Sequence, residues 1–349
     1  MNVNKKIVLL TPGFPADEND LACTTYLQDL VLSYKHYYPQ ANIEVITFQY
    51  PFRTGNYLWN GMKVYSAGGA NSKILRLLTW RKVLKRLNQI QDEGKIDIIH
   101  SFWLTECTYI GQRFCSKNNI KHVASVLGQD VKKENKYLDR IDPDKLTVVS
   151  TAPQLSELFF AVKNRKVKTM IPWGIDPQKL ILTTSVERTI DVIGVGSLNP
   201  LKDYSMFIDI IHELKKYFPK INACIIGKGE QMEMLRAKIE RCGLKENMEM
   251  KGELPPKKVF EWMCRSRVFL HTSSFEGQSM VMSEALYAGL RIVCFDVVSQ
   301  DEKDRILICD NKQIMVMALK RLMKEKLEHP SVKVQLVEET AQRYFEIYQ

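Results

Sequence analysis

The stretch FLHTSSFEGQSMVMSEAL, at residues 269–286, shows most clearly how this chain is built. An apolar run ends at His271, a polar loop with one glycine follows, and a helical pattern begins near Ser279. A short buried strand that leads through a loop into a helix is the repeating unit of parallel α/β sheets. A helix that begins where such a strand ends presents unpaired N–H groups and a partial positive charge, which suits an anion such as a diphosphate.

Two carboxylates flank this expected helix start. Glu276 falls in the loop, and Glu284 follows about a turn and a half into the helix. Each carboxylate accepts two hydrogen bonds, which matches the neighbouring hydroxyls of a sugar or a ribose. The same spacing also fits a surface charge in a loop and a helix residue with a local partner, so spacing alone leaves both interpretations open.

Two earlier stretches repeat the order of strand, glycine loop and helix. They are VIGVGSLNPLKD at 192–203 and IIGKGE at 225–230. Glycines such as Gly196 let the backbone approach a phosphate, and Lys202 would place a cation beside it. Each stretch alone is equally typical of a tight turn, and it is their order along the chain that points to a binding site.

Short apolar runs alternate with helical patterns through both halves of the chain, which predicts an α/β fold with two doubly wound parallel sheets. The expected strands lie at 6–11, 43–48, 97–101, 121–126 and 146–150 in the first half, and near 190–195, 221–226, 247–251, 267–272 and 291–295 in the second.

The joint between the halves is expected in IPWGIDP at 171–177, where two prolines and a glycine resist both helix and sheet. The predicted domains are therefore 1–171 and 172–332, with a C-terminal helix at about 333–349 that packs back on the first domain. Ligands bind beyond the carboxyl ends of the strands in such sheets. The active site is accordingly expected in the cleft between the two domains.

The composition is that of an ordinary globular protein, with 45% hydrophobic and 26% charged residues in 349. Apolar runs of four to five residues are far shorter than the ~20 that span a bilayer. The N-terminus lacks a signal-peptide pattern, and the eight cysteines include no C-x-x-C pair. These features predict a cytoplasmic protein with reduced thiols and no zinc site.

The net charge of +10 belongs mostly to the first half of the chain. Residues 1–170 hold 24 Lys and Arg against 15 Asp and Glu, whereas residues 171–349 hold 26 against 25. Nucleic acid, an anionic membrane surface, or an acidic or phosphorylated acceptor would each explain this excess, and so would a solvated basic face. No nucleic-acid-binding module is recognisable, so nucleic acid is not expected as a partner.

The clearest basic segment is residues 73–87, which has the pattern of an amphipathic helix. Leu77, Trp80, Leu84 and Leu87 form an apolar stripe at helical spacing, with basic residues on both sides. One interpretation is contact with anionic lipid or a lipid-linked acceptor at the inner face of the membrane. The other is a helix that packs this stripe against the sheet of the first domain.

From Ile171 to Val297 the second half resembles the C-terminal domain of a GT-B glycosyltransferase, closest to family 4 of the retaining enzymes, glycosyl transferases group 1. The resemblance rests on segments in the family's order. PWGID at 172–176 resembles P-N-G-V-D, GSLNPLKD at 196–203 resembles G-R-L-x-x-x-K-G, GKG at 227–229 matches G-x-G, the stretch from 243 to 252 resembles G-L…F-x-G, and residues 276–284 match E-x7-E.

The resemblance implies a role for each matching residue. Glu276 resembles the carboxylate that contacts the donor sugar, Glu284 the one that binds the nucleotide ribose, and Lys202 the cation beside the departing diphosphate. The other residues expected around the donor are Gly196, Ser197, Gly277, Gln278, Ser279, Met280 and Val281. Such enzymes need no metal, and the lone D-x-D at 142–144 is expected to be structural.

The sequence departs from the family pattern at two positions. Ser197 stands where the family usually has an arginine beside the diphosphate, and a serine supplies neither its charge nor its fork of donors. Leu127 replaces the histidine of a segment resembling H-G-x-D that ends at Asp130. Asp130, His100 and Gly13 are the residues of the first domain expected near the cleft, although a strand-end histidine is more often structural.

These features predict a retaining glycosyltransferase that moves a sugar from a nucleoside-diphosphate sugar to a saccharide or lipid-linked acceptor. The expected setting is the synthesis of cell-surface polysaccharide or glycolipid, with no metal or other cofactor. Two alternatives remain, a sugar-nucleotide-binding subunit that supports a catalytic partner and a nucleotide-sugar epimerase of the same fold.

Overall fold

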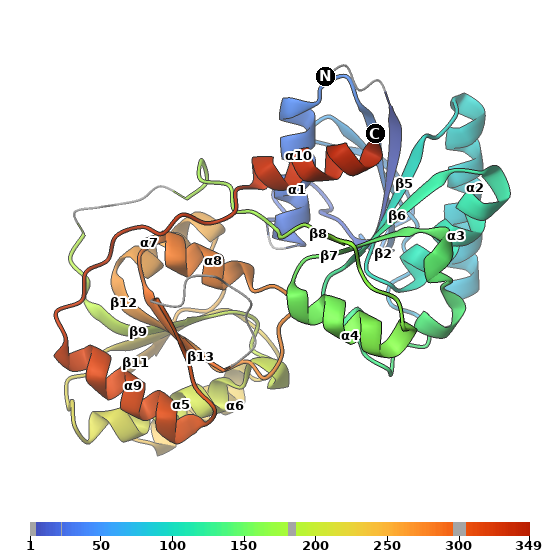
Figure 1. The fold of residues 1–349 in the computed structure, drawn as a ribbon. Coiled ribbons are helices and arrows are strands. Elements are labelled where there is room, and N and C mark those ends of the chain that lie inside the picture. Colours follow the sequence, from blue (N-terminus) through green and yellow to red (C-terminus); the bar gives the residue numbers. More distant parts are fainter. Residues whose placement is uncertain (1–4, 22, 181–185, 296–304) are drawn as a thin grey trace. The chain divides into compact units, whose positions relative to one another are not determined.

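A computed structural model describes residues 5–21, 23–180, 186–295 and 305–349. The chain forms two compact units (Figure 1). The first contains the residues up to Gly174 together with Leu336–Gln349, and the second contains Ile175–Gln335. Each unit has its own sheet with helices packed on it, and the two are described separately below.

The first unit is built on an eight-stranded sheet. Its strand order is β3-β4-β2-β1-β5-β6-β7-β8, and every neighbouring pair is parallel except β3 and β4. The central strand β1 has no exposed residue from Ile7 to Leu10, as a strand covered on both faces requires. The strands are β1 (Lys6–Gly13), β2 (Asn42–Tyr50), β3 (Gly55–Trp59), β4 (Met62–Ser66), β5 (Ile98–Phe102), β6 (Lys121–Val126), β7 (Thr147–Ser150) and β8 (Thr169–Met170).

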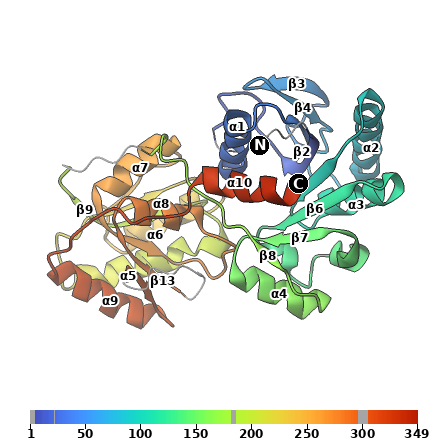
Figure 2. The same ribbon diagram turned by 45° about the horizontal axis from the view of Figure 1, so that its top comes forward.

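The helices of the first unit include one from the far end of the chain. They are α1 (Thr25–Tyr37), α2 (Arg76–Glu93), α3 (Glu106–Asn118), α4 (Pro153–Lys163) and α10 (Val337–Tyr348), with 3₁₀ turns η1 (Gln129–Val131), η2 (Leu138–Arg140) and η3 (Pro143–Lys145). Figures 1 and 2 both show α10 beside α1. The hydroxyls of Tyr34 and Tyr348 are 3.1 Å apart and buried, so α10 closes the core of this unit.

Helix α2 packs most of the expected stripe on the core, since Leu87 lies in the core cluster and Trp80 and Leu84 pack against it. Its buried residues are Thr79, Val83, Leu87 and Ile90. Leu77 is 63% exposed, so the predicted stripe from Leu77 to Leu87 was wrong at its start. The core-facing position is instead Thr79, whose Oγ1 donates to the carbonyl of Leu75 at 3.0 Å. A threonine whose hydroxyl bonds to the helix backbone in this way can be buried, yet as a polar residue it does not show in the sequence as part of an apolar stripe.

The second unit is built on a six-stranded sheet in the order β11-β10-β9-β12-β13-β14, with all pairs parallel. Helix α5 covers it with a continuous buried face that includes Phe207, Ile211 and Leu214. The strands are β9 (Ile190–Val195), β10 (Ala223–Ile226), β11 (Met248–Met250), β12 (Ser266–His271), β13 (Arg291–Cys294) and β14 (Ile306–Ile308). The helices are η4 (Pro200–Lys202), α5 (Tyr204–Lys215), α6 (Met232–Arg241), α7 (Pro256–Cys264), α8 (Met280–Tyr287) and α9 (Lys312–Lys324).

The parallel register of β10, β9 and β12 brings their carboxyl ends to one edge of this sheet. The loops that leave these three strands carry Gly227, Gly196 and Glu276 respectively. The α/β class with two mainly parallel sheets is as the sequence predicted, whereas strands β3, β4, β8 and β14 were not expected. Over the described residues, none of the helices has the length and apolar character needed to cross a membrane.

Candidate donor site

Two glycine loops at the carboxyl edge of the second sheet pack backbone against backbone. Gly227 has φ +148°, and a Cβ on it would lie 1.9 Å from the carbonyl oxygen of Gly196. A Cβ on Gly229 would lie 2.3 Å from the carbonyl oxygen of Leu198. The amide of Leu198 donates to the carbonyl of Lys228 at 2.9 Å and ties the loops together. No side chain fits between them, which explains the glycines in both loops.

The loop after β12 is fixed on the turn η4, which carries Lys202. Thr272 Oγ1 donates to the carbonyl of Lys202 at 2.8 Å, and Ser273 Oγ donates to the carbonyl of Leu201 at 3.2 Å. The amide of Ser274 also donates to Leu201, at 3.1 Å. These bonds place the backbone of Lys202 next to the loop that contains Glu276, although the two residues are 74 positions apart.

Lys202, Glu276 and His271 form a compact polar cluster. Lys202 Nζ donates to Glu276 Oε1, and His271 Nε2 lies 3.0 Å from the same oxygen. The side chains of Lys202 and Glu276 are 18% and 12% exposed, and that of His271 is 4% exposed. The ion pair is thus mostly shielded from water, where electrostatic interactions are stronger than at a surface.

The charge states of this cluster follow from its surroundings. Burial alone would raise the pKa of Glu276, but the hydrogen bond with His271 and the charge of Lys202 outweigh it and lower the pKa to about 2. Burial lowers the pKa of His271, an effect that exceeds the opposing influence of Glu276. At neutral pH the histidine is therefore neutral and donates its Nε2–H to an ionised carboxylate.

The start of helix α8 lies three residues after Gly277. Ser279, at the N-cap, has extended backbone and makes no side-chain capping bond. Its Oγ is buried and has no hydrogen-bond partner among the residues that the structure describes. A buried hydroxyl without a partner costs about 1–3 kcal/mol, and this one lies at the start of α8. The helix start adds N–H groups and positive potential that favour an anion.

The other predicted donor residues lie on the same elements. Gly277 is buried, and Gln278, Met280 and Val281 are partly exposed along the loop and the first turn of α8. Glu284 is partly exposed on the following turn. Gly196 is partly exposed at the end of β9, and Ser197 beside it is exposed.

Lys228 is the cation that the packed loops bring next to Ser197. Its carbonyl binds the amide of Leu198, and its ammonium pairs with Glu253. The side chains of this pair are 66% and 43% exposed, so Lys228 is held far less firmly than Lys202.

Sequence reasoning assigned no role to His271 or Thr272. Both follow the apolar run that predicts β12, and the carboxyl end of a parallel strand is where polar side chains gather around a ligand. Its place at the carboxyl end of an expected strand could have indicated His271 as a site residue. The bond from Thr272 to Lys202 depends on tertiary packing, and no sequence spacing indicates it.

In the first unit, His100 is fully buried. Its Nδ1 lies 2.6 Å from the hydroxyl of Tyr348, and its Nε2 lies 2.8 Å from Ser125 Oγ. Both ring nitrogens are therefore occupied within the core, and burial holds the pKa of His100 well below its usual value. The structure gives this strand-end histidine a packing role beneath α10.

Asp130 organises the loop that follows β6. Its carboxylate accepts from the amides of Leu104 at 2.8 Å, Gly128 at 2.7 Å and Leu127 at 3.2 Å. Only 6% of Asp130 is exposed, and burial raises the pKa of its carboxyl despite these donors.

The remaining residues named from the sequence of the first unit have local roles. Gly13 ends β1, where a Cβ would meet the side chain of Tyr50 at 3.5 Å. Asp142 caps the turn η3 by accepting from the amide of Asp144, and Asp144 pairs with Arg165 at 2.9 Å. No cluster of three or more His, Cys, Asp or Glu suited to a metal ion occurs within residues 5–21, 23–180, 186–295 and 305–349.

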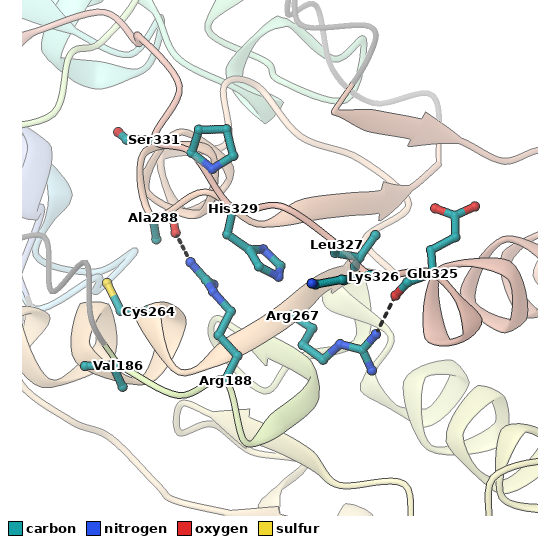
Figure 3. A pocket seen from close by; sticks show the side chains of 11 residues that line it. Val186, Arg188, Cys264, Arg267, Ala288, Glu325, Lys326, Leu327, His329 and Ser331 are labelled. Atoms are coloured by element: carbon teal, nitrogen blue, oxygen red, sulfur yellow. Dashed lines mark hydrogen bonds between the residues drawn. The ribbon is translucent and has the colours of Figure 1, made fainter.

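A cavity of about 570 Å³ lies at the opposite, amino edge of the second sheet (Figure 3). Arg188 donates to the carbonyl of Ala288 at 2.7 Å, and Arg267 donates to that of Glu325 at 3.1 Å. These carbonyls lie at the carboxyl ends of α8 and α9, so the arginines satisfy helix ends that would otherwise be unpaired. The cavity does not include Glu276 or its partners, and its two arginines serve to bond the helix ends.

Comparisons with known proteins identify a family match in the second unit and relatives that cover more of the chain. Residues 183–340 match the family described as glycosyl transferases group 1. One human relative, a phosphatidylinositol N-acetylglucosaminyltransferase component, is 25% identical over 76% of this chain and 58% of its own length. The amylovoran biosynthesis glycosyltransferase AmsD of Erwinia amylovora is 34% identical over 30% of this chain and 29% of its own. The chain thus spans little more than half of the human relative.

Solved structures show the same fold over nearly the whole chain. Sucrose-phosphate synthase from Thermosynechococcus elongatus has a TM-score of 0.73 at 13% identity and covers 99% of this chain and 94% of its own. Anabaena HepE, solved in complex with UDP, has a TM-score of 0.67 at 16% identity over 99% and 95%. The fold and the order of the motifs agree with this match: the chain has the GT-B fold, and its residues 183–340 match the glycosyl transferases group 1 family.

Proposed function

We propose that the chain is a retaining glycosyltransferase that uses a nucleoside-diphosphate sugar. The observation that carries this proposal is the shielded pair of Lys202 and Glu276 beside the start of α8. A cation, a carboxylate and a helix N-terminus at one sheet edge fit the three parts of such a donor. The match of residues 183–340 to the glycosyl transferases group 1 family supports it.

In the proposed complex the diphosphate lies at the start of α8. Lys202 and the first amides of the helix stabilise its charge, and Ser279 Oγ gains the hydrogen bond that it lacks within the described structure. Glu276 accepts hydrogen bonds from hydroxyls of the transferred sugar, and Glu284 accepts them from the ribose. His271 keeps the carboxylate of Glu276 oriented through the 3.0 Å contact.

The proposed reaction exchanges one bond at the anomeric carbon for another. The bond to the departing diphosphate breaks, and a bond to an acceptor hydroxyl forms on the same face of the sugar. The acceptor proton passes to the leaving phosphate, whose growing charge Lys202 offsets. We propose that no metal ion is needed, because Lys202 and the helix start supply positive charge at this place.

The proposed acceptor is a saccharide or a lipid-linked saccharide, and the proposed setting is cytoplasmic synthesis of cell-surface polysaccharide or glycolipid. The names of two relatives support these classes. One belongs to a phosphatidylinositol N-acetylglucosaminyltransferase, and the other is a glycosyltransferase of amylovoran biosynthesis.

The test begins with a thermal-shift screen of the purified chain against uridine, guanosine and adenosine diphosphate sugars, because a bound ligand raises stability by mass action. The donor that binds is then incubated with the chain, and release of its nucleoside diphosphate on transfer of the sugar to water is measured. We expect release by the wild type and a loss of about 100-fold or more in Glu276→Gln. The matched control Glu253→Gln, from an exposed ion pair, should release it at the wild-type rate.

A second candidate is a sugar-nucleotide-binding subunit that supports a catalytic partner. It is favoured by Ser197 and Leu127, which replace the arginine and histidine usual in the family. Tight donor binding with no release from any of the three classes would support this second candidate and overturn the enzyme. Failure of all three classes to bind would overturn both.

A further inference from the structure

Residues 73–78, KILRLL, form an exposed segment at the beginning of α2, which we call the leading segment. All six residues are exposed. The apolar ones are far from buried: Ile74 is 90% exposed, Leu77 63%, Leu78 50% and Leu75 40%. Scattered exposed apolar residues are normal on a soluble protein, but four within five positions form a patch that needs an explanation.

The leading segment is not needed to pack α2 on the sheet. That task belongs to Val83, Leu87 and Ile90, which are fully buried. Trp80, one turn after the leading segment, is anchored by the bond from its Nε1 to Glu106 Oε2 at 2.6 Å. The apolar side chains before it extend beyond this anchor, so their exposure is a feature of the folded helix.

Other exposed apolar residues follow neighbouring strands of the same sheet. Leu21, after β1, is 49% exposed, and Phe52, after β2, is 65% exposed. The leading segment itself comes after β4. Because β1, β2 and β4 are mutually parallel in the sheet, their carboxyl ends reach the same edge. Exposed apolar side chains therefore follow three neighbouring strands at that edge of the first sheet.

The sequence around the leading segment is basic. Residues 45–91 contain eight Lys and Arg and no Asp or Glu. Lys73, Arg76, Arg81 and Lys85 are exposed on or beside the segment. None of the four is paired with a carboxylate within the described ranges. Arg76 instead lies 5.5 Å from the ring centre of Trp80, which adds a half-buried aromatic to the basic surface.

We propose that the leading segment docks the first unit on an anionic lipid bilayer. Exposed Ile and Leu side chains enter the interface between headgroups and acyl chains, and the four basic residues meet lipid phosphates. A half-buried tryptophan beside them suits the headgroup level. Four exposed basic residues without carboxylate partners, in a stretch that has no Asp or Glu of its own, complement a surface of continuous negative charge rather than the mixed charges of a protein partner.

Vesicle flotation of the full chain tests this proposal. The probes are vesicles of phosphatidylcholine alone and of phosphatidylcholine with phosphatidylglycerol. The apolar variant is Ile74→Asp with Leu77→Asp, and its control is Met317→Asp, which changes a 69% exposed residue of α9. The charge variant is Lys73→Glu with Arg81→Glu. Its control, Lys166→Glu with Lys168→Glu, makes the same change in net charge at exposed positions of the same unit.

We expect the wild type to bind the anionic vesicles and not the neutral ones. The apolar variant should bind at least about tenfold more weakly, since one inserted Leu or Ile is worth about that factor. The charge variant should lose about fivefold for each basic residue removed, and more on reversal. Met317→Asp should bind the anionic vesicles like the wild type. The control with Lys166→Glu and Lys168→Glu should bind them within about twofold of the wild type.

Equal binding by the apolar variant and Met317→Asp would overturn the proposal, as would a wild type that floats with neither vesicle. All substituted residues are exposed, so circular dichroism and melting temperature should match the wild type and exclude misfolding. The inference goes beyond the proposed function, because nucleoside diphosphate release without lipid should be unchanged in every variant. A chain that binds vesicles but releases no product would leave this proposal standing and overturn only the proposed activity.

Discussion

Glu276→Gln is the substitution whose effect on stability the structure fixes most closely. It keeps the shape of the side chain but removes the charge that pairs with Lys202 and accepts from His271. The pKa of Glu276 is lowered from 4.5 to about 2. Because one unit of pKa difference between folded and unfolded chains equals about 1.4 kcal/mol, the charged form contributes roughly 3 kcal/mol at neutral pH.

Glutamine retains part of the hydrogen bonding, so we expect a net loss of about 2 kcal/mol in the second unit. For a unit of this size that corresponds to a fall of about 5 °C in its melting temperature. The control is Glu253→Gln, whose partner Lys228 is 66% exposed. An exposed pair of this kind contributes about 0–1 kcal/mol, so the control should melt close to the wild type.

The loss of stability in Glu276→Gln must also depend on pH, and the pKa of Glu276 gives the direction. The pKa of Glu276 in the folded chain lies below its unfolded value, so the stabilisation is complete above about pH 4.5 and is lost as pH falls towards 2. Calorimetric melting from pH 7 to pH 3 should show the gap between wild type and Glu276→Gln shrinking to less than about half. A gap that is constant with pH, or no larger than that of Glu253→Gln, would refute the reasoning.

Three further predictions follow from particular contacts. Gly227→Ala should destabilise the second unit by more than about 3 kcal/mol, because the new Cβ would lie 1.9 Å from the carbonyl of Gly196; Gly243→Ala, with φ +63° and open space around it, should lose only about 1 kcal/mol in the same urea titration. Tyr348→Phe removes the hydroxyl 2.6 Å from His100 Nδ1 and should destabilise the first unit by about 1–2 kcal/mol, whereas altered nucleotide affinity in this variant would contradict the packing role of His100. Nucleoside diphosphate release should be unchanged by EDTA, and restoration of a lost rate by added Mg²⁺ would contradict the proposed metal independence.

Most strands of the two sheets were predictable because each has a local pattern, whereas β3, β4, β8 and β14 were not expected. Buried strands such as 6–11 and 267–272 are short apolar runs, and the helices between them have apolar residues at helical spacing. The segments around Gly196, Gly227 and Glu276 were recognisable for a related reason. Gly227 and Gly229 are required by close backbone packing, which restricts the residue type strongly enough to leave a motif.

Contacts between distant segments were not predictable from patterns. His100 was expected near the ligand, but its surroundings depend on Tyr348, which lies 248 residues further along the chain. The stripe of α2 was expected to begin at Leu77, whereas the first buried position is Thr79, a polar residue that bonds to its own helix. The link between Thr272 and Lys202 likewise exists only after the second unit has folded.

The proposed function depends most directly on the binding of a nucleoside diphosphate beside Lys202. Isothermal titration of the purified chain with UDP, GDP and ADP tests this without any assumption about sugar or acceptor. We predict that at least one of them binds, and that Lys202→Ala weakens its binding by about tenfold or more. The control Lys245→Ala, from an exposed pair on the same unit, should leave the affinity unchanged. Equal affinity in Lys202→Ala and Lys245→Ala, or no binding of any of the three, would contradict the account.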